Sequence, residues 1–365
     1  MAESVLITGG AGFIGSHLAD DLLGAGYSVR ALDSLVDQVH GDGQRPDYLN
    51  DEVELITGDV RDADVVRGAL DGVDSVVHLA ARVGVGQSMY APGDYTAANS
   101  LGTAVLLEAL LERPVRKIVA ASSMSIYGEG AYEPAHAAER TRAQLEQAEW
   151  EPRGPRGEEL RPVPTREDKQ PMLASIYALT KYDQERLCLL YGAAYDVPVV
   201  ALRFFNVYGP RQALSNPYTG ALAIFASRLL NDRRPIVYED GGQRRDFINV
   251  ADVARACRLA LEGNGADSRP VNIGSGRSST VLEIAHQLGR VLGKEIEPEL
   301  PGTFRAGDIR HCFADVTLAR EELGFEAEIA LEDGMASLAG WLEGQVATDR
   351  FDNAAAELAE RGLTS

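Results

Sequence analysis

Thr8-Gly9-Gly10-Ala11-Gly12-Phe13-Ile14-Gly15 is the stretch from which the architecture of the chain follows. It comes after a short apolar run, Ser4-Val5-Leu6-Ile7, that is typical of a buried strand, and it leads into apolar residues at helical spacing. Gly10, Gly12 and Gly15 fit the pattern G-x-G-x-x-G. Glycine lets the backbone turn tightly and approach a pyrophosphate, and the N-terminus of the following helix attracts its charge. The stretch therefore predicts a dinucleotide-binding turn.

Length and composition restrict the class of protein. The 365 residues exceed one typical domain, which predicts one large domain or two closely packed ones. A hydrophobic content of 45% with 25% charged residues is ordinary for a soluble globular protein. The net charge of -20 argues against binding to nucleic acid or to an anionic membrane surface.

Nothing in the sequence indicates a membrane segment, a secretory leader or a metal centre. No apolar run reaches the ~20 residues of a membrane helix, and the first apolar run is already the strand before the glycine turn. Cys188, Cys257 and Cys312 are odd in number and far apart, so we expect reduced, mostly buried thiols and a cytoplasmic protein.

Strand and helix patterns alternate along the first 205 residues. The expected strands are 4–7, 29–33, 53–57, 74–81, 117–121 and 199–205, with a later short strand at 271–273. Repeated strand–helix units predict an α/β fold with a doubly wound, Rossmann-type parallel sheet. Asp33 ends the second strand about 20 residues after the glycine turn, where a carboxylate binds ribose hydroxyls and favours NAD over NADP. Asp59 follows the third strand and is placed to reach the adenine.

A second group of polar residues predicts the chemistry. Ser122 and Ser123 end the fifth strand, where side chains point into the ligand crevice of such sheets. Tyr177 and Lys181 lie four residues apart in a helical run expected over 173–191, so they share one face of that helix. The ammonium, together with the positive nicotinamide of an oxidised cofactor, is expected to lower the pKa of the phenol, which makes Tyr177 a general base, while Ser123 holds the substrate oxygen.

These elements resemble the extended short-chain dehydrogenase/reductase family, in its NAD-dependent nucleotide-sugar epimerase and dehydratase branch. Further motifs that carry the resemblance are Gly58-Asp59-Val60, His78-Leu79-Ala80-Ala81, Arg203-Phe204-Phe205-Asn206-Val207-Tyr208-Gly209-Pro210-Arg211, Arg245-Asp246-Phe247-Ile248 and Arg305-Ala306-Gly307-Asp308. The resemblance implies that Ser123, Tyr177 and Lys181 are catalytic and that NAD is the cofactor. His78 is expected to be a structural histidine.

The resemblance also implies which residues bind each ligand. The residues expected to hold NAD are Gly9, Gly12, Phe13, Ile14, Gly15, Asp33, Asp59, Val60, Leu79, Ala80, Ala81, Asn99, Ser122, Tyr177 and Lys181. Those expected to hold a nucleotide-diphosphate sugar are Ser123, Tyr177, Asn206, Arg245, Arg305 and Asp308. Guanidinium groups suit phosphates, and a carboxylate suits ribose hydroxyls.

The domain organisation follows from the same patterns. Residues 1–205 are expected to form the NAD-binding Rossmann domain, to which 236–274 partly return. Residues 206–235 and 275–345 would form a smaller, discontinuous α/β lobe for the nucleotide sugar, and 346–365 a helical tail that includes a helix near 353–363. The polar segment 129–170 is an insertion that is either a lid near the sugar or a surface excursion.

Several activities are compatible with this machinery. A 4-epimerase needs only transient oxidation at C4 to a 4-keto sugar and return of the hydride to the other face. The related 4,6-dehydratases carry Asp-Glu where this chain has Met124 and Ser125, which makes that activity less favoured. A reductase, or a non-catalytic NAD-binding regulator, stays open as an alternative, although regulators of this fold typically lose the Tyr or the Lys.

The substrate and the oligomeric state come only from resemblance. Residues 84–90, 125–130 and 212–220 look closest to the dTDP-L-rhamnose 4-epimerases, which form dTDP-6-deoxy-L-talose, and so does the insertion. UDP-glucose/galactose and UDP-glucuronate 4-epimerases are the rivals. The family forms homodimers through two helices. The apolar residues expected to supply that interface here are Leu106, Leu107, Leu110, Leu187, Leu190 and Tyr191.

Overall fold

A computed structural model describes residues 2–41, 43–213, 220–305, 308–343, 356–357 and 359–364. Its centre is a seven-stranded sheet in the order β12-β8-β5-β4-β1-β2-β3, in which every pair of neighbours is parallel. The strands are β1 (Ser4–Thr8), β2 (Ser28–Asp33), β3 (Glu54–Thr57), β4 (Ser75–His78), β5 (Lys117–Ser123), β8 (Val199–Phe204) and β12 (Arg269–Ile273). The predicted Rossmann-type sheet is confirmed.

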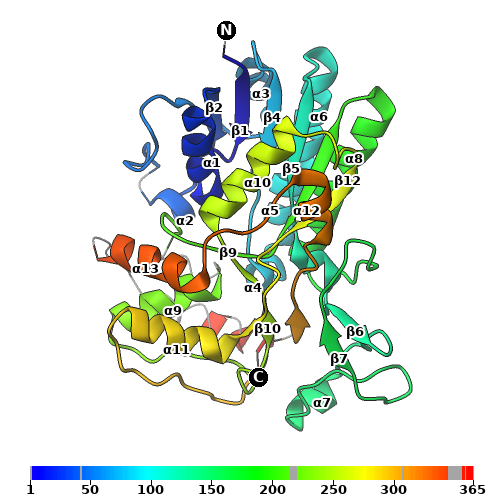
Figure 1. The fold of residues 1–365 in the computed structure, drawn as a ribbon, viewed down its shortest axis with the longest axis vertical. Coiled ribbons are helices and arrows are strands. Elements are labelled where there is room, and N and C mark those ends of the chain that lie inside the picture. The colour runs from blue at the N-terminus through cyan, green and yellow to red at the C-terminus, as the bar shows by residue number, and fades with distance from the viewer. Residues whose placement is uncertain are drawn as a thin grey trace.

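Helices cover both faces of this sheet (Figure 1). On one face α1 (Phe13–Gly24), α10 (Val250–Glu262) and α12 (Thr317–Leu323) share a hydrophobic core with the strands. On the other face α3 (Ala63–Ala69), α6 (Gly102–Glu112) and α8 (Ile176–Tyr195) share a second core. Because both faces are covered, β4, β5 and β8 are buried along their whole length, which explains the apolar runs at their centres.

A smaller lobe lies below the carboxyl ends of the strands (Figure 1). Its core is formed by α9 (Ala221–Leu230), α11 (Val281–Val291) and α13 (Leu331–Leu342). It also contains the parallel pair β9 (Asn206–Tyr208) and β11 (Phe247–Asn249), and a three-stranded sheet of β13 (Ser279–Thr280), β10 (Arg244–Arg245) and β14 (His311–Cys312). Phe247–Asn249 is thus paired in the lobe and not in the main sheet.

Several short elements border the cavity between sheet and lobe. They are α2 (Asp37–His40), α4 (Val85–Ser88), α5 (Pro92–Tyr95), the π-helical turn η1 (Thr96–Leu101) and the 3₁₀ turn η2 (Met124–Tyr127). The sequence pattern predicted only a loop where α2 forms. Four-residue helices escape periodicity analysis because they are barely longer than one turn.

The insertion 129–170 is partly regular. It contains the antiparallel pair β6 (Ala131–Glu133) and β7 (Arg161–Val163), with α7 (Arg142–Glu146) between them. Thr141 caps α7 with a reciprocal capping box to Gln144. Figure 1 shows this segment beside the lobe, at the lower end of the molecule.

The expected dimer residues need correction. Leu106, Leu107, Leu110 and Tyr191 are buried within the chain itself, because they face the sheet and the neighbouring helix. Leu190 is instead 57% exposed. Other large apolar side chains left in solvent by η1, α6 and α8 are Leu101, Leu111, Leu179 and Tyr195. Leu187, also expected, is half-buried, so the apolar face available to a partner overlaps the expected one only in part.

Other expectations concern the cysteines, membrane segments and the tail. All three cysteines are buried free thiols, as predicted. Within the described ranges no helix is long and apolar enough to cross a bilayer. Of the expected tail helix near 353–363, residues 353–355 and 358 lie outside the described residues. Of the stretch 212–220, only 212–213 and 220 are described.

Candidate functional site

The glycine turn joins β1 to α1 under tight steric constraint. Gly9 has φ +72°, and a Cβ there would lie 2.9 Å from the backbone nitrogen of Ala80. A Cβ on Gly15 would overlap the carbonyl oxygen of Gly9. Helix α1 begins after Gly12 with no side-chain cap and no acidic residue in its first turn, so its N–H groups face an open, electropositive end. This cradle fits a dinucleotide pyrophosphate.

Two carboxylates stand at the ends of the next strands. Asp33 at the end of β2 accepts hydrogen bonds from the backbone N–H of Ala11 at 3.0 Å and of Leu35 at 2.9 Å. Asp59 after β3 is paired with Arg61 at 2.6 Å, and the hydrogen bond from that guanidinium lowers the pKa of the carboxyl. Both side chains face the same cavity as the glycine turn. Their placement fits a ribose and an adenine.

One cavity of about 710 Å³ collects nearly all of the expected site residues. Its lining includes Gly9, Gly12, Phe13, Ile14, Gly15, Asp33, Asp59, Val60, Leu79, Ala80, Ala81, Ser122, Ser123, Tyr177, Lys181, Asn206, Arg245, Arg305 and Asp308. The cavity therefore runs from the glycine turn, across the carboxyl ends of the strands, to the smaller lobe.

Asn99 is the exception, since it does not line the cavity. It is fully buried in η1, where its Oδ1 accepts the backbone N–H of Arg82 at 2.7 Å. Its Nδ2 donates to the Oγ1 of Thr180 on α8 at 3.0 Å. The side chain ties η1 to the helix that carries Tyr177 and Lys181, as the family resemblance also implies. Its contact with the cofactor stays a prediction.

Ser123, Tyr177 and Lys181 meet where β5 ends against the start of α8. Burial raises the pKa of Tyr177, and the hydrogen bond with Ser123 opposes that rise. The Nζ of Lys181 donates to the carbonyl of Ala121 at 2.7 Å and to the Oε1 of Gln184 at 2.6 Å. Burial lowers the pKa of Lys181 to about 8. Lys181 is not among the groups that shift the pKa of Tyr177 in this structure, and its ammonium is bonded to Ala121 on β5 and to Gln184 on α8.

His78 belongs to a buried hydrogen-bond network behind Lys181. The imidazole is bonded to the Oγ1 atoms of Thr8 at 2.7 Å and Thr103 at 2.9 Å, and to the amide of Gln184 at 2.9 Å. Complete burial lowers the pKa of His78 to about 3, so the ring is neutral. His78 packs inside the sheet and does not line the cavity, which supports the predicted structural role.

The groups that line the lobe end of the cavity include Asn206, Arg245, Arg305 and the carboxylate of Asp308. Asn206 has a buried Oδ1 without a hydrogen-bond partner among the described residues. Arg305 is paired with Asp308 at 3.1 Å and lies over the ring of Tyr238, 4.6 Å from its centroid. Burial raises the pKa of Asp308, but neighbouring guanidinium groups, Arg305 first, outweigh it and hold that pKa low. This end suits a diphosphate with an attached ribose.

Sequence reasoning missed several parts of the wall. Tyr238 and the apolar side chains Val83, Val85 and Met89 line the cavity, as does Leu363 near the end of the chain. Thr364 also forms an isolated bridge to Arg305. Val85 and Met89 stand in the stretch 84–90 that carries the family resemblance, but Tyr238, Val83 and Leu363 stand in no recognisable motif, so only the tertiary structure could place those three.

The comparisons with known proteins agree with this geometry. A dTDP-L-rhamnose 4-epimerase from Burkholderia thailandensis is 36% identical over 355 residues, covering 93% of this chain and 95% of that protein. A UDP-glucose 4-epimerase from Thermotoga maritima, solved with UDP-glucose, is similar with a TM-score of 0.78 and 30% identity over 93% of this chain and 98% of that one. The UDP-glucose 4-epimerase of Thermus thermophilus, solved with NAD, is similar with a TM-score of 0.75 and 31% identity over 94% and 100%.

A family model extends over most of the chain. The model of the NAD dependent epimerase/dehydratase family matches residues 5–274, from the first strand to the end of the last strand of the main sheet. That range includes the glycine turn, Ser123, Tyr177 and Lys181. The chain therefore belongs to the NAD dependent epimerase/dehydratase family.

Proposed function

We propose that this protein is a nucleotide-sugar 4-epimerase that interconverts dTDP-L-rhamnose and dTDP-6-deoxy-L-talose with a retained NAD. One observation carries the proposal. A single cavity holds the glycine turn, the Ser123–Tyr177–Lys181 group and the cationic lobe end, so cofactor, reacting carbon and diphosphate have adjoining places.

Tyr177 is the group that moves the proton. It would accept the proton of the sugar C4 hydroxyl and later return it, while Ser123 holds the same oxygen. NAD, when bound, supplies the acceptor and donor for the C4 hydride. The cofactor would be held by the glycine turn, Asp33, Asp59 and the small residues Ala80 and Ala81, all of which line the cavity.

The lobe would hold the rest of the substrate while the sugar turns over. Asn206, Arg245 and Arg305 would bind the diphosphate, and Asp308 a ribose hydroxyl. An epimerase needs such an anchor because the keto sugar must present both faces at C4 without leaving. Binding energy from the diphosphate does not depend on which face is presented.

The residues beside Ser123 argue for epimerisation over dehydration. Elimination of water across C5 and C6 requires an acid and a base near those carbons. Met124 and Ser125 line the cavity at the two positions that follow Ser123, and a thioether cannot donate a proton.

The sugar is assigned from the apolar wall near Tyr177. The backbone N–H of Tyr177 donates to the Oγ of Ser88 at 3.0 Å, which places α4 against the start of α8. Val85 of α4 and the following Met89 are 37% and 40% exposed and line the cavity. A 6-deoxy sugar carries a methyl group that such a wall would bury. The similarity to UDP-glucose 4-epimerases keeps UDP-linked sugars as the second candidate.

A product assay separates these candidates. Purified protein is incubated without added cofactor with dTDP-L-rhamnose, UDP-glucose, UDP-galactose or UDP-glucuronate, and products are identified by NMR. The proposal expects a C4 epimer from dTDP-L-rhamnose at the highest rate, and a rate about 10²- to 10⁴-fold lower for Tyr177→Phe with NAD still bound. An epimer only from a UDP-sugar would reassign the substrate. Turnover that requires added NADH or NADPH would indicate a reductase.

A further inference from the structure

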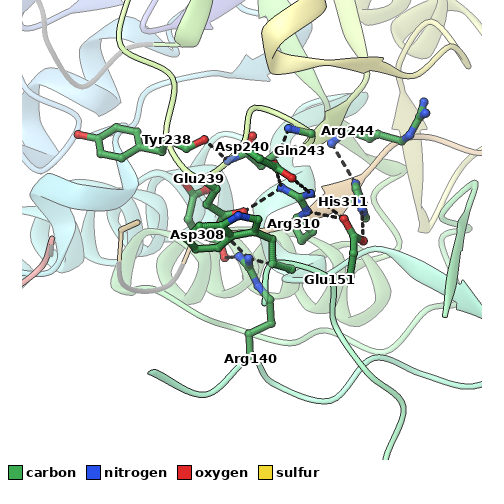
Figure 2. Close-up of polar contacts among 12 residues, drawn as sticks. Arg140, Glu151, Tyr238, Glu239, Asp240, Gln243, Arg244, Asp308, Arg310 and His311 are labelled. Atoms are coloured by element: carbon green, nitrogen blue, oxygen red, sulfur yellow. Dashed lines mark hydrogen bonds and ion pairs between the residues drawn. The ribbon is translucent and has the colours of Figure 1, made fainter. Parts of the chain in front are cut away.

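The insertion 129–170 contacts the lobe without entering the cavity. Among the described residues that line the cavity, none belongs to this segment. The segment packs instead against two loops of the lobe, around residues 238–244 and 308–311 (Figure 2). This position is incompatible with a lid over the sugar, and the buried charges at the contact distinguish it from a surface excursion.

Arg140 makes the central contact (Figure 2). Its side chain is only 4% exposed. One guanidinium nitrogen donates to Glu239 at 2.8 Å, and the other donates to the backbone carbonyl of Asp308 at 2.9 Å. Within the insertion the same group is paired with Glu129 at 3.5 Å and donates to the carbonyl of Trp150 at 3.2 Å. A single side chain therefore links the insertion to both loops of the lobe.

Two glutamates of the insertion extend this contact along the second loop. Glu129 is buried and accepts the backbone N–H groups of Arg310 at 2.7 Å and His311 at 3.2 Å. Glu151 accepts from the guanidinium of Arg310 at 2.6 Å and is bonded to the ring of His311 at 2.9 Å. The backbone of residues 308–311 is thus held by the insertion at several consecutive positions.

The loops held in this way carry the lobe end of the cavity. Tyr238 is adjacent to Glu239, and its ring supports the guanidinium of Arg305. Asp308 is paired with Arg305, and Arg245 donates to the carbonyl of Arg310 at 2.9 Å. The insertion contacts the backbone of residues 308–311 and the side chains of Glu239, Arg310 and His311. The residues of the same two loops and of β10 that line the cavity are Tyr238, Arg245, Arg305 and Asp308.

We propose that the insertion is a buttress for the nucleotide-diphosphate subsite, and that Arg140 is its principal positioning residue. This inference rests on the proposed function, because it assumes that the lobe end receives the nucleotide diphosphate. It assigns the insertion to the binding of the nucleotide and separates it from the chemistry at Tyr177. Arg140 touches neither substrate nor cofactor and acts through Asp308 and Glu239.

The type of side chain matters at this position. A buried ion pair that loses one partner leaves the other charge less compensated. Without Arg140, Glu129 would lose its ion pair and Glu239 would keep, among the described residues, only its pair with Arg310 at 3.0 Å. A guanidinium has five donors in a rigid fork and serves both loops at once, whereas a lysine ammonium on a flexible stem keeps the charge but not the fork. Replacement by lysine should therefore rescue only part of the effect.

The test measures nucleotide binding and turnover separately. The full-length, NAD-loaded protein is titrated calorimetrically with dTDP and with UDP, and steady-state kinetics are measured with the best sugar substrate. Arg140→Gln is compared with Arg140→Lys. The matched control is Arg142→Gln, two residues away, where the arginine and its partner Glu146 are 69% and 54% exposed.

The expected result is a Kd for the preferred nucleotide about tenfold higher in Arg140→Gln, a matching rise in KM and a kcat within twofold of the wild type. Arg140→Lys should be intermediate and Arg142→Gln unchanged. If Arg140→Gln does not fold, Glu151→Gln at a side chain 55% exposed replaces it, with an expected threefold weakening.

Three results would overturn the inference: an unchanged Kd, a loss of kcat at constant Kd, or equal weakening by Arg142→Gln. A lower melting temperature with unchanged Kd would reduce Arg140 to a structural residue and also overturn it. If the wild-type protein binds neither dTDP nor UDP, the proposed function itself fails. If it binds one of them and Arg140→Gln binds it equally well, only the buttress is refuted.

Discussion

At the scale of single residues, the hydrogen bond of Ser123 bears on the pKa of Tyr177. This bond opposes the burial that raises the pKa of the phenol. Because the general base must be deprotonated, Ser123→Ala should move the acidic limb of the kcat/KM profile to higher pH and lower the rate on the plateau. A pH–rate series for both proteins checks this. An acidic limb that stays in place would show that Ser123 does not act on Tyr177.

His78 gives a residue-scale prediction about stability. Its folded pKa of about 3 lies below the value of 6.5 for an exposed imidazole, so the unfolded chain takes up the proton first as pH falls. The contribution of neutral His78 to the free energy of unfolding is therefore complete above pH 6.5, and it is lost as the pH falls from 6.5 to 3. Between pH 6.5 and 4 this amounts to about 3 kcal/mol, from 1.36 kcal/mol per pKa unit.

The comparison is with His78→Asn, which cannot take up that proton. The variant is expected to be less stable at pH 7 because buried hydrogen bonds are lost, yet its free energy of unfolding should fall less steeply towards pH 4. Chemical denaturation at several pH values measures both slopes. Parallel slopes would contradict the account of His78.

At the scale of elements, the β1–α1 turn depends on the absence of side chains at specific glycines. In Gly15→Ala the new methyl group would overlap the backbone of the turn, so the purified variant should contain less NAD and unfold at lower temperature. Gly24 ends the same helix, and a Cβ there meets nothing within 4 Å. Gly24→Ala should keep full NAD content and be more stable by roughly 0.5–1 kcal/mol. Equal NAD content in the two variants would contradict the assignment of the glycine turn as the site that binds the pyrophosphate of NAD.

The elements also show what the sequence can and cannot predict. Strands such as β5 and β8 were predictable because burial on both faces leaves uninterrupted apolar runs. The cavity residues of the glycine turn and the pair Tyr177 and Lys181 were predictable, because a tight turn and a helix face each impose a fixed spacing in the sequence. The π-helical form of η1 was not predictable. The burial of Leu106, Leu107 and Leu110 of α6 within the chain was not predictable either, because periodicity marks an apolar face without telling whether it packs inside or outside the chain. Tyr238 and the contacts of Arg140 depend on loops that meet only in the folded lobe.

At the scale of the whole molecule, the outer surface of η1, α6 and α8 is the proposed dimer interface. Helices α6 and α8 pack side by side, and Leu101, Leu111, Leu179 and Leu190 are each about half exposed there. Leu190→Arg should convert a dimer into a monomer in light scattering, because a charge would enter an apolar contact. Leu300→Arg, at a lobe residue 47% exposed, is the control and should stay dimeric. A monomeric wild type, or a dimer that tolerates Leu190→Arg, would exclude this surface.

The central claim is that the protein inverts the configuration at C4 by a redox step, and that the keto sugar stays bound between the two hydride transfers. It is tested most directly with dTDP-L-rhamnose carrying deuterium at C4, incubated with the purified protein without added cofactor. The account predicts dTDP-6-deoxy-L-talose that retains the deuterium at C4, with no net change in the nicotinamide absorbance. Product in which the C4 deuterium has been replaced by solvent hydrogen, or no C4 epimer from any nucleotide sugar, would contradict it.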